Sequence, residues 1–230
     1  HWDLWILKLN AFGEKENEHI LTAFPENEQI IENGRSILEI NNGYIVLGSL
    51  HEYELDAPSD IWLTHFDLDL SDNGDTLWSS IWDIDAYDYP TSMVANLEGG
   101  YTIAGYSSST NSGENGSSWV IKSDIAGAGN ILTSFSGNNF IYSMIEDENG
   151  NYILAGKKTE NSNTQGWIIS ISPSGVQNWE RLYGDADIDA FYSIEQTSDK
   201  GFILSGETYN NGLGDILHVK TDPNGNVLSE

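Results

Sequence analysis

The chain has 230 residues, with 9 Lys and Arg against 36 Asp and Glu, and a formal net charge of −27. So acidic a chain lacks the basic surface that binding to nucleic acid requires. It has no cysteine, which excludes disulfides and thiolate metal sites, and no apolar run near the roughly 18 residues that span a bilayer. A hydrophobic share of 39%, rich in aromatic residues, predicts a folded core rather than disorder.

The first element along the chain is a short phrase that recurs five times, in which Trp or Leu precedes apolar residues, a polar turn and Gly. The aligned positions are Trp5, Trp62, Trp119, Trp167 and Leu217, which are 57, 57, 48 and 50 residues apart. A residue repeated in every unit stabilises that unit. We therefore expect the four tryptophans to pack between neighbouring units, each with its indole N–H bonded to a neighbouring carbonyl group.

A second phrase alternates with the first and occurs four times, beginning at Ser36, Ser92, Ser143 and Ser193. Each copy ends on an aromatic residue, an apolar run and a closing glycine, at Gly48, Gly105, Gly156 and Gly206. The apolar runs have the length and composition of strands that are covered on both faces. The turns before them (42–43, 99–100, 149–150 and 200–201) all contain Gly, which permits tight hairpins. No segment has the 3.6-residue period of a helix.

The alternation predicts an all-β protein, a β-propeller of four-stranded antiparallel blades. The strand order gives four complete blades preceded by half a blade, as in a five-bladed ring or a fragment of a larger one. We treat residues 1–230 as one domain, with a half blade at 1–35 and blades at 36–91, 92–142, 143–192 and 193–230. Both ends supply the second half of a blade, so either strands upstream of His1 are missing or the first hairpin makes an incomplete fifth blade.

The phrases from Ser92 to Gly105 and from Asp215 to Asn226 resemble the β-propeller repeats of secreted and surface bacterial proteins. In that family the repeats often precede a C-terminal sorting domain. The resemblance covers nearly the whole chain and implies the fold and an extracellular or cell-surface location. It implies no particular activity. The first blade departs most, because residues 25–34 lack the usual Tyr-Gly-Gly and Asn10 stands where Asp is typical.

The longest departure from the repeat is an acidic turn, from Asp67 to Asp75, four residues longer than its equivalents. Asp69, Ser71, Asn73 and Asp75 alternate oxygen ligands around Gly74, as at the start of a calcium loop. The bidentate Glu that ends such a loop is absent, since Ser80 holds that position. The four residues are candidate Ca²⁺ ligands, and a solvated acidic turn is the alternative.

Acidic and aromatic residues precede the first strand of two blades and form a candidate binding surface for a protein or glycan partner. Its members are Trp82, Asp83, Asp85, Tyr87 and Tyr89 in one blade and Asp185, Asp187 and Asp189 in another. If these loops meet on one rim, the rim carries concentrated negative charge that favours cations or basic partners. The alternative is that the charge serves solubility alone.

Evidence for catalysis is weak, because the five histidines occupy unrelated repeat positions and no nucleophile elbow or phosphate loop occurs. The sequence therefore predicts a non-catalytic binding, adhesion or scaffold module, part of a larger surface protein or assembly. The alternative is a carbohydrate-active enzyme or lectin that uses the central funnel. An enzyme of that kind would need an accessible pair of carboxylates about 5 to 10 Å apart.

Overall fold

The structure is a computed structural model that describes residues 3–21, 30–54, 56–67, 76–111, 115–184, 188–210 and 212–228. Within these residues it contains strands and no helix, so nothing there is a helix long and apolar enough to cross a membrane. The strands are β1 Leu4–Leu9, β2 Lys15–Leu21, β3 Ile30–Ile40, β4 Gly43–Glu52, β5 Ser59–Phe66, β6 Thr76–Trp82, β7 Tyr87–Ala95, β8 Tyr101–Ser108, β9 Ser117–Ser123, β10 Gly129–Phe135, β11 Asn139–Glu146, β12 Tyr152–Glu160, β13 Asn163–Ile171, β14 Gln177–Tyr183, β15 Ile188–Gln196, β16 Phe202–Asn210 and β17 Leu213–Thr221. The all-β prediction is confirmed.

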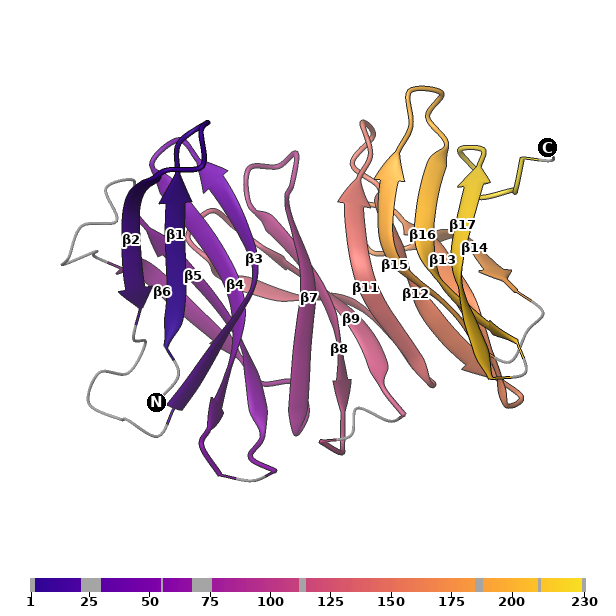
Figure 1. Cartoon of the computed structure of the whole chain (residues 1–230), viewed down its shortest axis with the longest axis horizontal. Coiled ribbons are helices and arrows are strands. Elements are labelled where there is room, and N and C mark those ends of the chain that lie inside the picture. Colours follow the sequence, from indigo (N-terminus) through magenta and orange to yellow (C-terminus); the bar gives the residue numbers. More distant parts are fainter. Residues whose placement is uncertain are drawn as a thin grey trace.

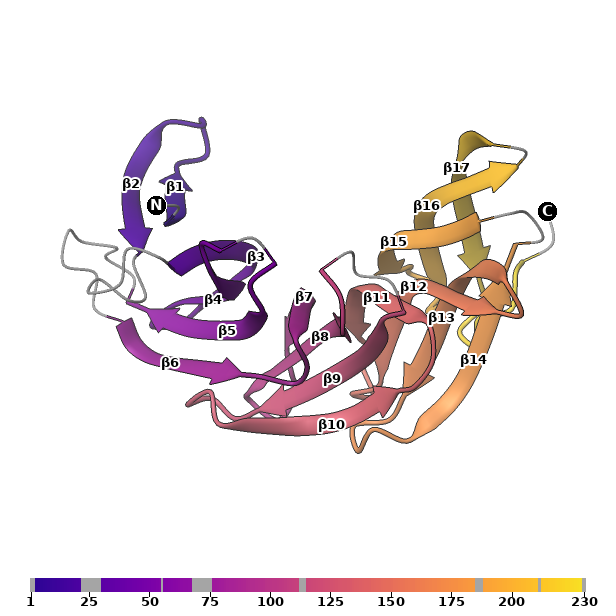
Figure 2. The same cartoon turned by 90° about the horizontal axis from the view of Figure 1, so that it is seen from below.

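Consecutive strands pair antiparallel into meanders that we call units: unit 1 is β3–β6, unit 2 is β7–β10, unit 3 is β11–β14 and unit 4 is β15–β17. Strands β1 and β2 form a separate pair before unit 1. The units follow one another along an open arc, with β3, β7, β11 and β15 on its inner side and β6, β10 and β14 on its outer side (Figure 1, Figure 2). Within the described residues the arc does not close into a ring (Figure 2).

The first hairpin of each unit turns where the sequence placed glycine-containing pairs. Gly43 has φ +151°, and a Cβ there would lie 1.7 Å from the carbonyl oxygen of Phe66, so a side chain cannot be accommodated. The corresponding turns of units 3 and 4 are longer, and their left-handed position falls on Gly150 at φ +79° and on Lys200 at φ +67°. The longer turn is therefore made with and without glycine at the left-handed residue.

The hydrophobic core consists of layers between consecutive units. Trp62, Trp119 and Trp167 are each 1% exposed and lie in three successive core clusters. Their indole N–H groups donate to Ser79 Oγ, Ser107 Oγ and Glu180 Oε1 respectively. For these three tryptophans the packing prediction is confirmed, although their acceptors are side chains rather than carbonyl groups.

Trp5 does not follow this pattern, and the prediction that it packs like its equivalents is wrong. Its side chain is 59% exposed and its indole N–H donates to Glu18 Oε2 at 3.3 Å on the same hairpin. The reason is that no described unit precedes β1, so nothing covers that face of the strand (Figure 2).

Neighbouring units are also joined through the backbone, where the third strand of one unit meets the first strand of the next. The Ser59 N–H donates to the Ala86 carbonyl at 3.1 Å, and the Asn139 N–H donates to the Gly116 carbonyl at 3.0 Å. Thr164 pairs with Ile188 in a parallel bridge at the third junction. These bonds hold the four inner strands in one fixed arc.

Candidate functional site

Each of the four inner strands carries a β-bulge at the same place. The register shifts between Gly34 and Ser36 in β3, and at the equivalent points of β7, β11 and β15. The extra residues are Arg35, Thr91, Tyr142 and Tyr192. A bulge redirects a side chain out of the strand's alternation, and bulges are frequent beside functional sites. This repeated bulge places four side chains of three chemical kinds, Arg, Thr and Tyr, on the inner side of the arc.

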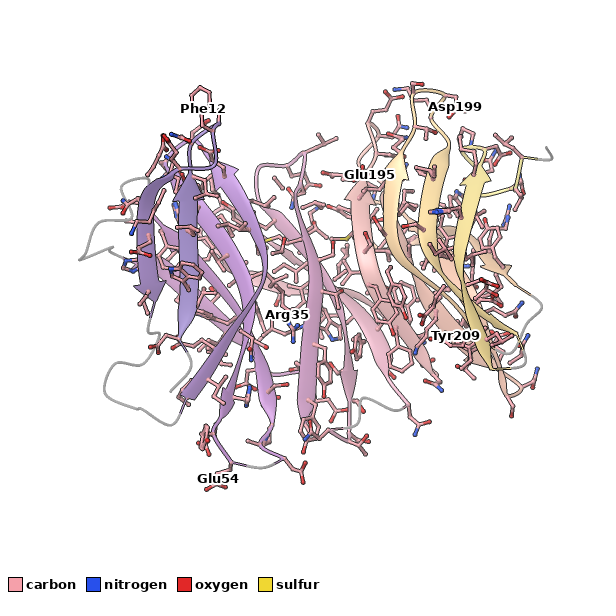
Figure 3. The ribbon with its side chains drawn as sticks, viewed as in Figure 1. Phe12, Arg35, Glu54, Glu195, Asp199 and Tyr209 are labelled. Carbon is pink, nitrogen blue, oxygen red and sulfur yellow. The ribbon has the colours of Figure 1, made fainter. Side chains whose placement is uncertain are left out.

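Two further positions beside each bulge also differ from unit to unit. The first position lies two residues before the bulge residue. The second position is the cross-strand partner of the first, and it directly follows the closing glycine. With the bulge residues they make up the inner site: Asn33, Arg35 and Ser49 in unit 1, Tyr89, Thr91 and Tyr106 in unit 2, Phe140, Tyr142 and Lys157 in unit 3, and Ala190, Tyr192 and Glu207 in unit 4. Arg35, on β3, faces the space between β3 and β7 in Figure 3.

Five aromatic rings of the inner site form a continuous row across units 2, 3 and 4. Tyr89 stacks on Tyr106 with ring centroids 4.9 Å apart, and Tyr106 meets Phe140 edge-on at 4.9 Å. Tyr142 lies 6.1 Å from Tyr106, and Tyr192 follows 5.1 Å from Tyr142. Tyr192 is 47% exposed, Tyr89, Tyr106 and Tyr142 are half-buried and Phe140 is buried, so the row is partly open to solvent.

Charged groups accompany this row. The Lys157 ammonium lies 4.8 Å from the centroid of Phe140 and 6.0 Å from that of Tyr142. Burial lowers the pKa of Lys157, and the nearby charge of Glu207 opposes that shift. The Tyr192 hydroxyl donates a hydrogen bond to the Glu207 carboxylate. Burial is the main cause that raises the pKa of Tyr192, and this hydrogen bond raises it further. Both tyrosine and lysine therefore sit where water is partly excluded.

A pocket of about 250 Å³ adjoins the row at the junction of units 1 and 2. Asn33, Arg35, Ser49 and Tyr89 of the inner site line it, and Tyr87, Asp56 and Asn111 close its rim. The rim is held by hydrogen bonds: the Tyr87 hydroxyl donates to the Asp56 carbonyl at 2.7 Å and Asn111 Nδ2 donates to Asp56 Oδ1 at 2.7 Å. Two of the predicted aromatic surface residues, Tyr87 and Tyr89, thus lie together at a pocket. Their role in binding stays a prediction.

The predicted acidic surface is brought together only in part. Asp83 lies with Asp60 and Asp88, and the carboxylate oxygens of the three are within 4.8 Å of one another. Burial raises the pKa of Asp88 to about 6, and the nearby charge of Asp83 adds a smaller increase. Hydrogen bonds from Ser107 Oγ and the Ile84 N–H oppose this rise. Asp85 lies outside this group and accepts the N–H of Ala86.

Other predicted site residues lie elsewhere. Trp82 is half-buried at the end of β6, where it packs on the core between units 1 and 2 and its indole donates to the Gly129 carbonyl at 3.4 Å. Asp189 is only 1% exposed, so its placement on a binding surface is corrected: the residue belongs to the buried start of β15, as Asp88 does in β7. Asp185 and Asp187 lie outside the described residues.

The four predicted calcium ligands, Asp69, Ser71, Asn73 and Asp75, also fall outside the residues that the structure describes. The calcium site therefore remains a prediction from the sequence.

Sequence reasoning missed most of the inner site. The missed residues lie within or beside the repeat phrases, whose shared residues indicate a structural role: Arg35, Tyr106, Tyr142, Lys157 and Glu207. A usable signal was present, because the residue after each closing glycine is Ser, Tyr, Lys or Glu while that glycine and the apolar run before it recur in every copy. Variation inside an otherwise constant phrase marks a position that the fold does not prescribe.

Comparisons with known proteins bear on the fold. No family model and no curated protein sequence matches the chain. Among solved structures, a protein of unknown function from Bacteroides caccae has a TM-score of 0.52 and 13% identity, covering 96% of this chain and 72% of that one. The endo-arabinase from Bacteroides thetaiotaomicron has a TM-score of 0.50 and 8% identity, covering 94% and 84%. At such identities the likeness concerns the fold alone.

Proposed function

We propose that this chain is a β-propeller module that binds a carbohydrate on its inner site, by stacking sugar rings on the aromatic row. The observation that carries the proposal is the row itself, from Tyr89 to Tyr192, which crosses three units on the inner side of the arc. A sugar ring has an apolar face that packs on aromatic rings and hydroxyls that need polar partners at its edge. Asn33, Ser49 and Glu207 supply such partners beside the row.

The stacking surface is supported by neighbouring structure rather than by free loops. Tyr89 and Tyr106 are cross-strand partners, and Phe140 pairs with Lys157 in the next unit. Side chains anchored on paired strands lose little freedom when a ligand binds, which favours affinity. The extracellular or surface location that the repeats imply belongs to this proposal, because that is where such a module would meet glycans.

The test is binding of neutral and acidic oligosaccharides, followed by NMR titration, with Tyr142→Ala as the main variant. We expect about a fivefold loss of affinity, since stacking on an aromatic ring contributes on the order of 1 kcal/mol and each 1.4 kcal/mol is tenfold. Tyr53→Ala, an exposed tyrosine outside the inner site, is the matched control and should bind normally. Equal binding by the parent and Tyr142→Ala would sink the proposal.

A hydrolytic role is the second candidate, and one contact favours it. The Tyr192 hydroxyl donates to Glu207 next to the stacking row, so a carboxylate is already oriented where a sugar would lie. Glycoside hydrolysis uses positioned carboxylates, and in some families a tyrosine acts as nucleophile. Release of reducing ends from a bound oligosaccharide, abolished by Glu207→Gln, would establish the enzyme. Binding with no release by the parent would leave the binding module.

A further inference from the structure

The inner site holds two positively charged groups, Arg35 and Lys157. In so acidic a chain each would be expected to form an ion pair with a carboxylate. The chain has nine Lys and Arg residues among 36 acidic ones, and five of the nine, Lys15, Lys122, Lys158, Lys200 and Lys220, form ion pairs with carboxylates. Among the described residues, neither Arg35 nor Lys157 has a carboxylate within ion-pair distance. Lys8 and Arg181 likewise have no ion pair among the described residues, so four of the nine cations are without one, and two of those four belong to the inner site.

The two groups are linked through the aromatic row. The Arg35 charge acts on Tyr89 and Tyr106, while Lys157 lies over Phe140 and Tyr142. Tyr106 contacts both Phe140 and Tyr142, so one ring connects the surroundings of the two cations. A ligand stacked along this row would therefore meet a guanidinium on one side and an ammonium on the other.

Resting on the proposed function, we infer that the bound carbohydrate carries carboxylates, as in an oligosaccharide of hexuronic acids, and that Arg35 and Lys157 hold them. A guanidinium presents paired N–H donors that match a carboxylate, and an ammonium adds a compact charge. An ionised carboxylate would replace the missing partner of each cation. A neutral glycan would leave both unpaired.

The net charge of −27 does not prevent such binding. At physiological ionic strength the screening length is about 8 Å, so charges on the outer surface act weakly on a ligand inside the arc. Contacts at hydrogen-bond distance are screened much less. The other charged residue of the inner site is Glu207, whose carboxylate already accepts the Tyr192 hydroxyl, while Glu54 and Asp56 line the adjoining pocket together with Arg35. Local groups thus decide which ligand is preferred.

The probes are trigalacturonic acid and trimannuronic acid, with their fully methyl-esterified forms as neutral counterparts that keep the same rings. We expect each acid to bind at least about tenfold more tightly than its ester, since a charged hydrogen bond contributes more than one power of ten in affinity. Arg35→Gln and Lys157→Gln should each reduce that preference, by weakening the binding of the acid more than the binding of the ester. Lys15→Gln, which removes an exposed ion pair on β2, is the control.

The outcomes separate this inference from the function on which it rests. Equal binding of acid and ester, lost in Tyr142→Ala, overturns the inference and keeps the carbohydrate site. Absence of binding by every probe overturns both. A hexaglutamate peptide is included as a carboxylate source without sugar rings. If it binds as tightly as the acids and independently of Tyr142, carboxylates bind there but stacking on sugars does not occur, and the inference falls. Matching melting temperatures for all variants confirm that they are folded.

Discussion

The middle of the arc and its N-terminal end contain the same repeat, but the repeated tryptophan is buried in the middle and exposed at that end. Trp119, in the layer between units 1 and 2, is 1% exposed, whereas Trp5, at the same repeat position, is 59% exposed. Both have a bonded indole N–H and both lie on a strand of a regular hairpin. The difference teaches that burial here is a property of the junction and not of the unit, because the apolar face of each unit is covered by its neighbour.

The largest expected effect separates these two tryptophans. Trp119→Ala should lower the free energy of unfolding by about 3 to 5 kcal/mol, because it empties a packed layer and leaves Ser107 without its donor. Trp5→Ala should cost less than about 1 kcal/mol, as expected of an exposed side chain. Urea denaturation of both variants measures the difference. Similar losses would mean that the face of β1 is covered in solution.

A second prediction concerns a buried carboxylate in the middle of the arc. Burial raises the pKa of Asp88 to about 6 from its ordinary value of 3.8. The stability that this shift contributes is therefore complete below about pH 4 and is lost as the pH rises through 6. From pH 7 to pH 4 the parent should therefore gain up to about 3 kcal/mol of stability relative to Asp88→Asn. Denaturation at both pH values tests this.

The control for that measurement is Asp85→Asn, at an exposed position between β6 and β7, two residues before β7 begins. Its pH dependence should match that of the parent. The expectation for Asp88 fails if the parent and Asp88→Asn respond to pH in parallel.

The smallest effect is expected at the other end of the arc. Ile216, on β17, is 78% exposed, and Ile216→Ser should change the free energy of unfolding by no more than about 0.5 kcal/mol. Denaturation is measured at two protein concentrations. A larger loss that depends on concentration would show that copies of the chain associate through this end and bury the residue.

The sequence predicted those features that depend on repetition. Tight turns, apolar strands and the packing of Trp62, Trp119 and Trp167 recur because every unit solves the same packing problem, and recurrence is visible without a structure. Trp5 was misjudged because its burial depends on a neighbour, and a neighbour cannot be read from the residue itself. Asp189 was misjudged because an acidic residue beside a loop is usually exposed.

The sequence predicts some of the residue types at the inner site but not how those residues are arranged in space. Tyr87 and Tyr89 are predicted as surface aromatic residues, and the structure places both at one pocket. Tyr142 and Tyr192 are distant in sequence and reside in phrases that otherwise look structural. Their proximity, with ring centroids 5.1 Å apart, follows from the bulge in each inner strand and from the angle between units, neither of which a periodic pattern specifies.

The shared bulge has a consequence for how such a protein can diversify. The extra residue in each inner strand, from Arg35 to Tyr192, is offset from the alternation that fills the core. A single codon change there can alter what the inner surface recognises while the layers between units stay intact. On the proposed function, such positions, one per unit, open new specificities to natural variation or to library selection on an unchanged framework, with Tyr142 and Tyr192 varied together because their rings are in contact.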